Sequence, residues 1–271
     1  MASRFSTLRV AVLVVAGFAA ALGVVSMTHA AEPVDKTELR NAIRELLQKE
    51  PDLVLDVLRN NSEVVLETAQ EGSNVRRKKA AQAQWAQDAK TPKRYSTDTP
   101  ARRGSDKAPV TIVVYSDFTC PYCRQADAVL EELYPVYKDK VRILFKPLPK
   151  SESALSLSAA RYSLAAFMQD KEKGWNYYRA LFAGVADLDR DGETFLKALA
   201  VREGLDMKRL TADAAGPKVK AQLEADADEA DSLEVPGTPY FLVNDLIVRG
   251  YVPKEVFALA IDTALQMKAG K

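Results

Sequence analysis

The sequence is most informative at residues 110–123, which read VTIVVYSDFTCPYC. The β-branched residues from Val110 to Tyr115 predict a buried strand. Two cysteines separated by two residues follow closely, and Arg124 to Tyr137 then have the spacing of an amphipathic helix. The stretch therefore predicts a strand that leads into a Cys-x-x-Cys motif at the start of a helix.

The two sulfurs of this motif are expected to differ in their chemistry. A sulfur at a helix N-terminus lies beside unpaired backbone N–H groups and the positive end of the helix dipole, which favour the thiolate. Pro121 suits the first turn, where an N–H would have no partner. We therefore expect Cys120 to attack disulfides and Cys123 to resolve them, while Pro121 and Tyr122 tune the redox properties of the pair.

The composition limits the alternatives for this motif. The 271-residue chain has two cysteines and one histidine, His29, so it cannot supply two further Cys or His ligands for a zinc site. No Cys–His pair can form once the segment containing His29 is removed, and no cofactor is expected. Two thiolates alone can hold a soft ion, so Cu(I) binding at Cys120 and Cys123 stays open as an alternative.

The first thirty residues have the features of a secretory signal peptide. Arg4 and Arg9 precede an apolar run at residues 10–25. This run is shorter than the roughly 20 residues that span a bilayer, so cleavage after Ala30 and a periplasmic location are expected, with an uncleaved anchor as the alternative. Cleavage lowers the Lys and Arg total from 38 to 36 against 37 Asp and Glu. This balance and the export signal argue against nucleic acid as a partner.

Residues 31–90 have the periodicity of helices, beginning at a capping-box-like pair, Asp35 and Glu38. Gly72-Ser73-Asn74 could interrupt the last helix. The helices of residues 31–90 could fold back on the main domain, or their apolar residues could pack against other copies of the segment. We favour the second arrangement, an oligomerisation stalk. These apolar residues include Leu39, Ile43, Leu46, Leu53, Val57, Leu58 and Val65. Residues 91–108, rich in Ser, Thr and Pro, predict a linker, and a chain that starts near Thr91 is expected to be a folded monomer.

The remaining residues, 109–271, predict one α/β domain. A second strand is expected at Val141–Phe145, and residues 151–233 have helical patterns throughout. A hairpin follows, with Tyr240–Val243 and Leu246–Arg249 joined by Asn244-Asp245, and a helix closes the chain. This order resembles a thioredoxin fold with an inserted helical domain. Within the insertion, a group of acidic residues is expected to form a solvated helix face: Glu224, Asp226, Asp228, Glu229 and Asp231.

A second motif, Val235-Pro236-Gly237-Thr238-Pro239, stands just before the hairpin. At this place in the topology it resembles the cis-proline of the thioredoxin fold. The resemblance implies a cis bond between Thr238 and Pro239. It also implies that the backbone of Thr238 lies against the sulfurs, where it can hold an extended substrate segment.

Together, Ser116–Cys123 and Gly237–Pro239 resemble motifs of the DsbA-like branch of thioredoxin-fold oxidoreductases. The segment Leu39–Lys90, including EPDLVL at residues 50–55, is similar to the N-terminal region of ScsC proteins of the suppressor-of-copper-sensitivity system. This resemblance implies a secreted thiol–disulfide oxidoreductase that acts on cysteine-containing proteins. It further implies a membrane thiol electron donor similar to DsbD or ScsB, and a homo-oligomer, a trimer rather than a dimer.

Two departures from DsbA bear on the direction of the reaction. Tyr122 stands where DsbA has a histidine that helps to stabilise the thiolate, so a less oxidising pair is expected. Thr238 stands where DsbA has valine and disulfide isomerases have threonine. Both favour an isomerase or reductase, while a DsbA-like dithiol oxidase remains the alternative. Val114 occupies the position of a buried acid in DsbA and thioredoxin, which leaves Asp117 or water as the proton acceptor.

Overall fold

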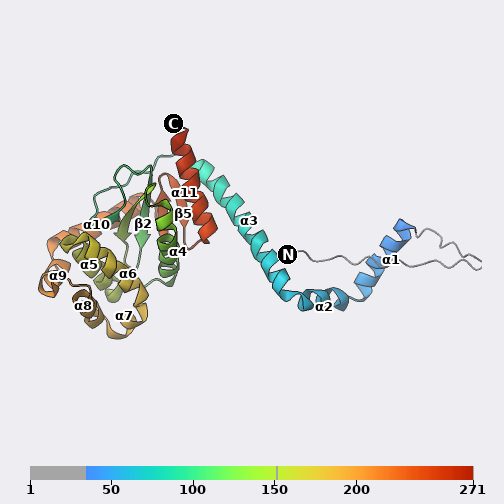
Figure 1. The fold of residues 1–271 in the computed structure, drawn as a ribbon, viewed down its shortest axis with the longest axis horizontal. Helices are drawn as coiled ribbons and strands as arrows, with labels where there is room; N and C mark the ends of the chain where they lie inside the picture. Colours follow the sequence, from blue (N-terminus) through green and yellow to red (C-terminus); the bar gives the residue numbers. More distant parts are fainter. Residues whose placement is uncertain (1–34, 151, 271) are drawn as a thin grey trace, which may run out of the picture. The chain divides into compact units, whose positions relative to one another are not determined.

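The computed structural model describes residues 35–150 and 152–270, which form helices and one five-stranded sheet (Figure 1). The proposed signal peptide, with Arg4, Arg9 and the cleavage point after Ala30, lies outside the described residues. The chain divides after Ser62 into two compact units, which are described separately. Among the described residues, no helix is both long enough and apolar enough to cross a bilayer.

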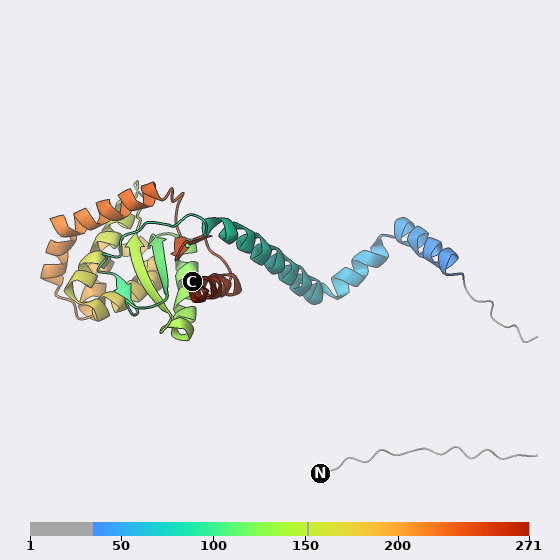
Figure 2. The same ribbon diagram turned by 90° about the horizontal axis from the view of Figure 1, so that it is seen from above.

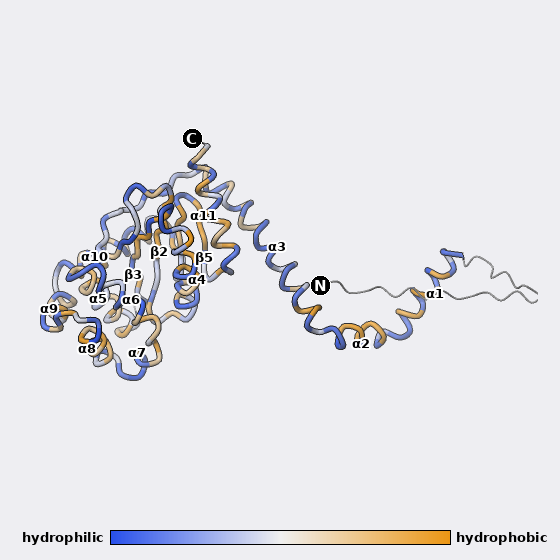
Figure 3. Tube along the Cα trace, in the orientation of Figure 1, coloured by the Kyte–Doolittle hydropathy of each residue, from blue (hydrophilic) through white to orange (hydrophobic). Residues whose placement is uncertain are grey.

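The first unit contains α1 (Lys36–Lys49) and α2 (Asp52–Asn60). The side chain of Asp35 caps α1 by accepting a hydrogen bond from the N–H of Thr37 at 2.9 Å. Pro51 lies between the two helices, where its fixed φ and missing N–H do no harm. No residue of either helix is buried, and apolar segments alternate with polar ones along both (Figure 3). Their exposed apolar residues are Leu39, Ile43, Leu46, Leu47, Leu53, Val54, Leu55, Val57 and Leu58.

The long helix α3 (Ser62–Asp88) runs without a break through Gly72-Ser73-Asn74, so the possible interruption does not occur. A glycine costs a helix only about 1 kcal/mol, and the surrounding Glu, Gln, Arg and Lys are good helix formers. In its last turns, Trp85 is buried and its Nε1–H donates to the carbonyl of Ile247 at 2.8 Å. The N–H of Ile247 donates in turn to Asp88 Oδ2 at 3.1 Å. The end of α3 therefore covers the backbone of a sheet strand.

The sheet has the order β1-β3-β2-β4-β5, in which β2 and β3 are parallel and the other neighbours antiparallel. The predicted strands and the hairpin are confirmed. They are β2 (Val110–Ser116), β3 (Val141–Pro147), β4 (Tyr240–Val243) and β5 (Leu246–Arg249). The short strand β1 (Arg102–Arg103) was not predicted. It lies within residues 91–108, where Thr99 and Ala101 are buried against the rest of the domain.

Helices cover both faces of the sheet (Figures 1 and 2). On one face, α4 (Pro121–Tyr137) and α11 (Lys254–Ala269) pack with Ile112 and Val114 of β2. On the other, Ala230 of α10 (Pro217–Ser232) packs with Val113 and Tyr115. The period-2 alternation of β2 thus places successive side chains in two separate cores.

The insertion is helical, as predicted, but it is divided into six helices. They are α5 (Ala154–Gln169), α6 (Lys171–Ala183), α7 (Val185–Asp191), α8 (Glu193–Arg202), α9 (Met207–Ala214) and α10. The observed architecture is the predicted α/β fold with an inserted helical domain.

Candidate active site

The two cysteines lie where the central strand gives way to a helix. Cys120 is the N-cap residue of α4, and Pro121 is the first residue of that helix. The Cys-x-x-Cys motif therefore forms the first turn of the helix, as predicted. Both cysteines are free thiols. Cys120 is 7% exposed and Cys123 is 1% exposed, so Cys120 is the more accessible of the two.

The environment of Cys123 favours its protonated form. Burial raises the pKa of Cys123 to about 12, and the neighbouring Cys120 adds to the increase. The side chains of Ser116 and Thr238 and the N–H of Asp117, which donates to Cys123 Sγ at 3.4 Å, only partly offset this effect. At neutral pH the site therefore holds one buried thiol and one more accessible sulfur at a helix N-terminus.

The second predicted motif meets the thiols in space. The Thr238–Pro239 peptide bond is cis, as predicted. The thiol of Cys120 donates to the carbonyl oxygen of Thr238 at 3.7 Å, although the two residues are 118 positions apart. The carbonyl of Pro239 accepts a hydrogen bond from the N–H of Gly250 at 2.8 Å, which joins this loop to the residues after β5. The structure thus brings together Cys120, Cys123 and Thr238.

The residues around the motif divide into exposed and buried ones. Tyr122 is 60% exposed and is available to a bound substrate. Phe118 is buried, with its ring centroid 4.7 Å from that of Phe182 and 5.5 Å from that of Phe145. These rings give the loop before Cys120 a rigid support. Val114 is buried in the core below the site, so an apolar side chain fills the position where an acid was sought.

Two features of the structure were missed by sequence reasoning. The side chain of Ser116 acts to lower the pKa of Cys123, and no sequence motif marks it. Asp226 and Glu229 are not on a solvated face: Lys146 of β3 is buried, with its Nζ 2.5 Å from Glu229 and 3.6 Å from Asp226. A lysine within a buried strand could have signalled the need for such acidic partners.

Metal binding has little support beyond the cysteine pair. Within the described part of the chain, no three His, Cys, Asp or Glu side chains gather into a group that could hold a metal ion. Cu(I) at this site would therefore depend on the sulfurs of Cys120 and Cys123.

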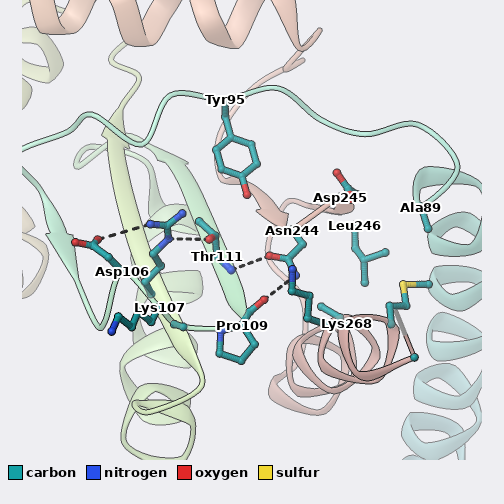
Figure 4. A pocket seen from close by; sticks show the side chains of 15 residues that line it. Ala89, Tyr95, Asp106, Lys107, Pro109, Thr111, Asn244, Asp245, Leu246 and Lys268 are labelled. Carbon is teal, nitrogen blue, oxygen red and sulfur yellow. Dashed lines mark hydrogen bonds and ion pairs between the residues drawn. The ribbon is translucent and has the colours of Figure 1, made fainter.

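A cavity of about 850 Å³ lies elsewhere, near the start of β2 (Figure 4). The N–H of Thr111 donates to Asn244 Oδ1 at 2.8 Å, and Arg142 donates to Thr111 Oγ1 at 2.8 Å. Asp106 forms an ion pair with Arg142 at 3.6 Å. These polar groups hold the β4–β5 turn to the central strand. The cavity includes neither cysteine and is not part of the redox site.

Comparison with known proteins supports the assignment of the fold. A family model described as Thioredoxin matches residues 96–263. The "Probable disulfide bond formation protein D" of Bacillus cereus is 31% identical over 160 residues, covering 55% of this chain and 72% of that protein. The Na(+)/H(+) antiporter NhaA 1 of Salinispora arenicola is 32% identical over 163 residues. The match covers 60% of this chain but only 24% of the antiporter, so the similarity concerns one part of that protein.

Solved structures also show similarity to proteins with a thioredoxin-like fold. A thioredoxin-like oxidoreductase from Silicibacter pomeroyi is 30% identical with a TM-score of 0.53, covering 62% of this chain and 94% of that structure. Proteus mirabilis ScsC in a transitional conformation has 18% identity and a TM-score of 0.55, covering 85% of this chain and 97% of that structure, and it supports the fold alone. Given the family match, the paired thiols and the adjoining cis-proline, the chain belongs to the thioredoxin family, with a catalytic domain of the thiol–disulfide oxidoreductase type.

Proposed function

We propose that this chain is a disulfide isomerase or reductase that acts on cysteine-containing proteins of the bacterial envelope. The observation that carries the proposal is the unequal pair of thiols beside the Thr238 carbonyl. The Cys120 thiolate attacks a substrate disulfide, forms a mixed disulfide and releases one substrate sulfur as a thiolate. Either that thiolate attacks again and restores the reduced enzyme, or Cys123 displaces the substrate and leaves the Cys120–Cys123 disulfide.

Two residues of the site favour this direction over net oxidation. Tyr122 is a neutral and exposed side chain between the cysteines, so it supplies no charge to stabilise a thiolate. A pair whose thiolate is less stabilised oxidises its substrates less strongly. Thr238 provides a carbonyl acceptor for Cys120, and its side chain acts to lower the pKa of Cys123.

The apolar residues of α1 and α2 support a second part of the proposal, self-association. Nine large apolar residues on these two helices are exposed, which is unusual for a segment that functions alone. A coiled coil formed by these helices from several copies would bury the apolar residues. We propose a trimer rather than a dimer. Several active sites on one assembly could then hold a misfolded substrate while limiting access of oxidants.

We also propose a cellular location and an electron donor for the enzyme. Export through a cleaved signal peptide places the protein in the periplasm, and a membrane thiol electron donor similar to DsbD or ScsB returns the pair to the reduced form. Thiol trapping of the Cys120–Cys123 pair in cells tests the direction. A mostly reduced pair is expected. A mostly oxidised pair would instead indicate an oxidase, the function suggested by the name of the Bacillus cereus relative.

The division of labour between the sulfurs is tested by trapping. Cys123→Ala should accumulate mixed disulfides through Cys120, because the resolving thiol is missing. Cys120→Ala is the matched control and should form none. Equal trapping by both variants, or by neither, would contradict the assigned roles.

A further inference from the structure

Asp117 makes two backbone contacts with the redox motif. It is buried in the loop between β2 and Cys120. Its N–H donates to Cys123 Sγ at 3.4 Å. Its carbonyl accepts a hydrogen bond from the N–H of Cys120 at 3.1 Å. The backbone N–H of Asp117 therefore contacts Cys123, and its backbone carbonyl contacts Cys120.

The carboxylate of Asp117 is fully engaged within the protein. Oδ1 accepts hydrogen bonds from the N–H and the Oγ1–H of Thr119 at 2.8 and 2.9 Å. Oδ2 lies 3.3 Å from the N–H of Lys150, which follows β3. In addition, the carbonyl of Ser116 accepts from the N–H of Leu148 at 2.8 Å. The carboxylate thus ties the loop before Cys120 to the segment after β3.

These contacts assign a task to a residue that the proposed function has not used. We infer that Asp117 is a positioning residue for the second half of the reaction: its carboxylate fixes the loop so that its own N–H points at Cys123 Sγ. A carboxylate whose two oxygens both accept backbone hydrogen bonds is held in place and is poorly suited to carry protons away. This inference rests on the proposed dithiol chemistry of Cys120 and Cys123.

The step concerned is the resolution of a mixed disulfide. The Cys123 thiol loses its proton to water, and its sulfur attacks Cys120 Sγ. A bond forms between the two protein sulfurs as the bond from Cys120 to the substrate sulfur breaks. The substrate sulfur leaves with the electron pair as a thiolate. An N–H held toward Cys123 Sγ stabilises the thiolate that makes this attack.

Asp117→Asn and Asp117→Ala separate positioning from proton transfer. Asparagine keeps an oxygen for both Thr119 donors but has no carboxylate to accept a proton, whereas alanine loses all three acceptor contacts. We expect the alanine variant to slow resolution by about tenfold or more, which corresponds to about 1.4 kcal/mol. The asparagine variant should stay within about fivefold of the natural protein, since one hydrogen bond contributes only about 1 kcal/mol. The pH profile of resolution should be the same in both.

The reduced full chain and the disulfide 5,5′-dithiobis(2-nitrobenzoate) provide the measurement. Attack by Cys120 releases the first coloured thiolate, and resolution by Cys123 releases the second, so the two steps are separated in time. Asp88→Asn is the matched control, because Asp88 is also a buried, hydrogen-bonded carboxylate but contacts Ile247 and Gln84 instead. It should leave the second phase unchanged. If Asp117→Ala does not fold, Thr119→Val, which loses only the hydroxyl contact, should slow the second phase by about fivefold.

The outcomes are distinct. If Asp117→Asn is as slow as Asp117→Ala and its pH profile changes, Asp117 is a proton acceptor and the inference is wrong. If every Asp117 and Thr119 variant that folds shows a normal second phase, Asp117 has no positioning role. If the natural protein itself releases no second thiolate, the failure belongs to the proposed dithiol function.

Discussion

The unequal burial of the two cysteines has a direct consequence for their reactivity. Because the pKa of Cys123 is raised to about 12, its thiolate fraction is very small between pH 6 and 9. Limited treatment of the reduced protein with iodoacetamide in that range should therefore modify Cys120 and leave Cys123 free. Modification of Cys123 should increase only toward pH 12. Mass spectrometry of the separated peptides measures the modification of each cysteine. Equal labelling of both residues at pH 7 would contradict the assigned environments.

Tyr122 offers a second prediction at the scale of one residue. Replacing this exposed side chain with histidine places an imidazole, and in part an imidazolium, beside the Cys120 thiolate. The reduced form should become more stable, and the reduction potential in glutathione buffers should rise by about 30 mV or more, equivalent to about 1.4 kcal/mol. Tyr122→Phe is the control and should change the potential little. An unchanged or lower potential in the histidine variant would count against this reasoning.

Single residues also show where prediction from the sequence succeeded and where it failed. The contact of Thr238 with Cys120 could be anticipated because the motif stands at a known place in the topology. The acidic partners of Lys146 could not, because Asp226 and Glu229 have the helical spacing of an ordinary solvated face. Their burial depends on how α10 packs across the sheet, which is a tertiary effect. The contacts of Asp117 were beyond prediction for the same reason, since Lys150 is distant in sequence.

At the scale of the helices and strands, α10 is attached to the sheet through an ionisable cluster. Burial raises the pKa of Asp226 to about 7, and Glu229 adds to the increase, while Lys146 and Gln222 oppose it. Between about pH 4 and 7 the unfolded chain ionises this group while the folded protein keeps its proton, so the free energy of unfolding falls as the pH rises. Asp226→Asn should remove this pH-dependent fall in the free energy of unfolding. Relative to the natural protein it should gain on the order of 2 kcal/mol between pH 5 and 8.

Urea unfolding at the two pH values is the appropriate measurement. Asp228 lies on the same helix but is exposed, so Asp228→Asn should show the same pH dependence as the natural protein. A parallel response of the Asp226 and Asp228 variants would exclude Asp226 as the titrating group.

The elements themselves were predicted unevenly. Strands β2, β3, β4 and β5 follow β-branched and apolar runs, and the Asn244-Asp245 turn marks the hairpin clearly. Strand β1 has only two residues, Arg102 and Arg103, and a basic pair in a segment rich in turn formers gives no strand signal. It forms because β3 has a free edge that the chain passes, which depends on the assembled sheet.

For the whole molecule, the central prediction links assembly to activity. The intact mature chain is expected to be an oligomer, and a chain that starts at Glu63, the first residue of the second compact unit, is expected to be a monomer. The shortened chain lacks the exposed apolar residues of α1 and α2 and keeps only Val65 of the proposed self-association positions, while both thiols remain. It should retain dithiol reactivity and lose isomerisation of a scrambled-disulfide substrate.

Light scattering and an isomerisation assay test the two halves of this prediction separately. A monomeric intact chain would exclude self-association through these helices. An oligomer whose isomerase activity survives the truncation would show that assembly and activity are independent.

The last turns of α3 cover the backbone of β5 at Ile247. This contact implies that the helix also protects the sheet edge from aggregation. Trp85 and Asp88 satisfy the outward backbone groups of Ile247, which otherwise offer a template for a strand from another chain. The sequence predicts that a chain starting near Thr91 is a folded monomer, but that chain lacks both side chains and would leave this backbone edge uncovered. We expect that chain to form aggregates that bind thioflavin T, while the chain from Glu63 stays soluble. The last turns of α3 would thus prevent other strands from pairing with this edge, and they belong to the second compact unit rather than to the proposed stalk.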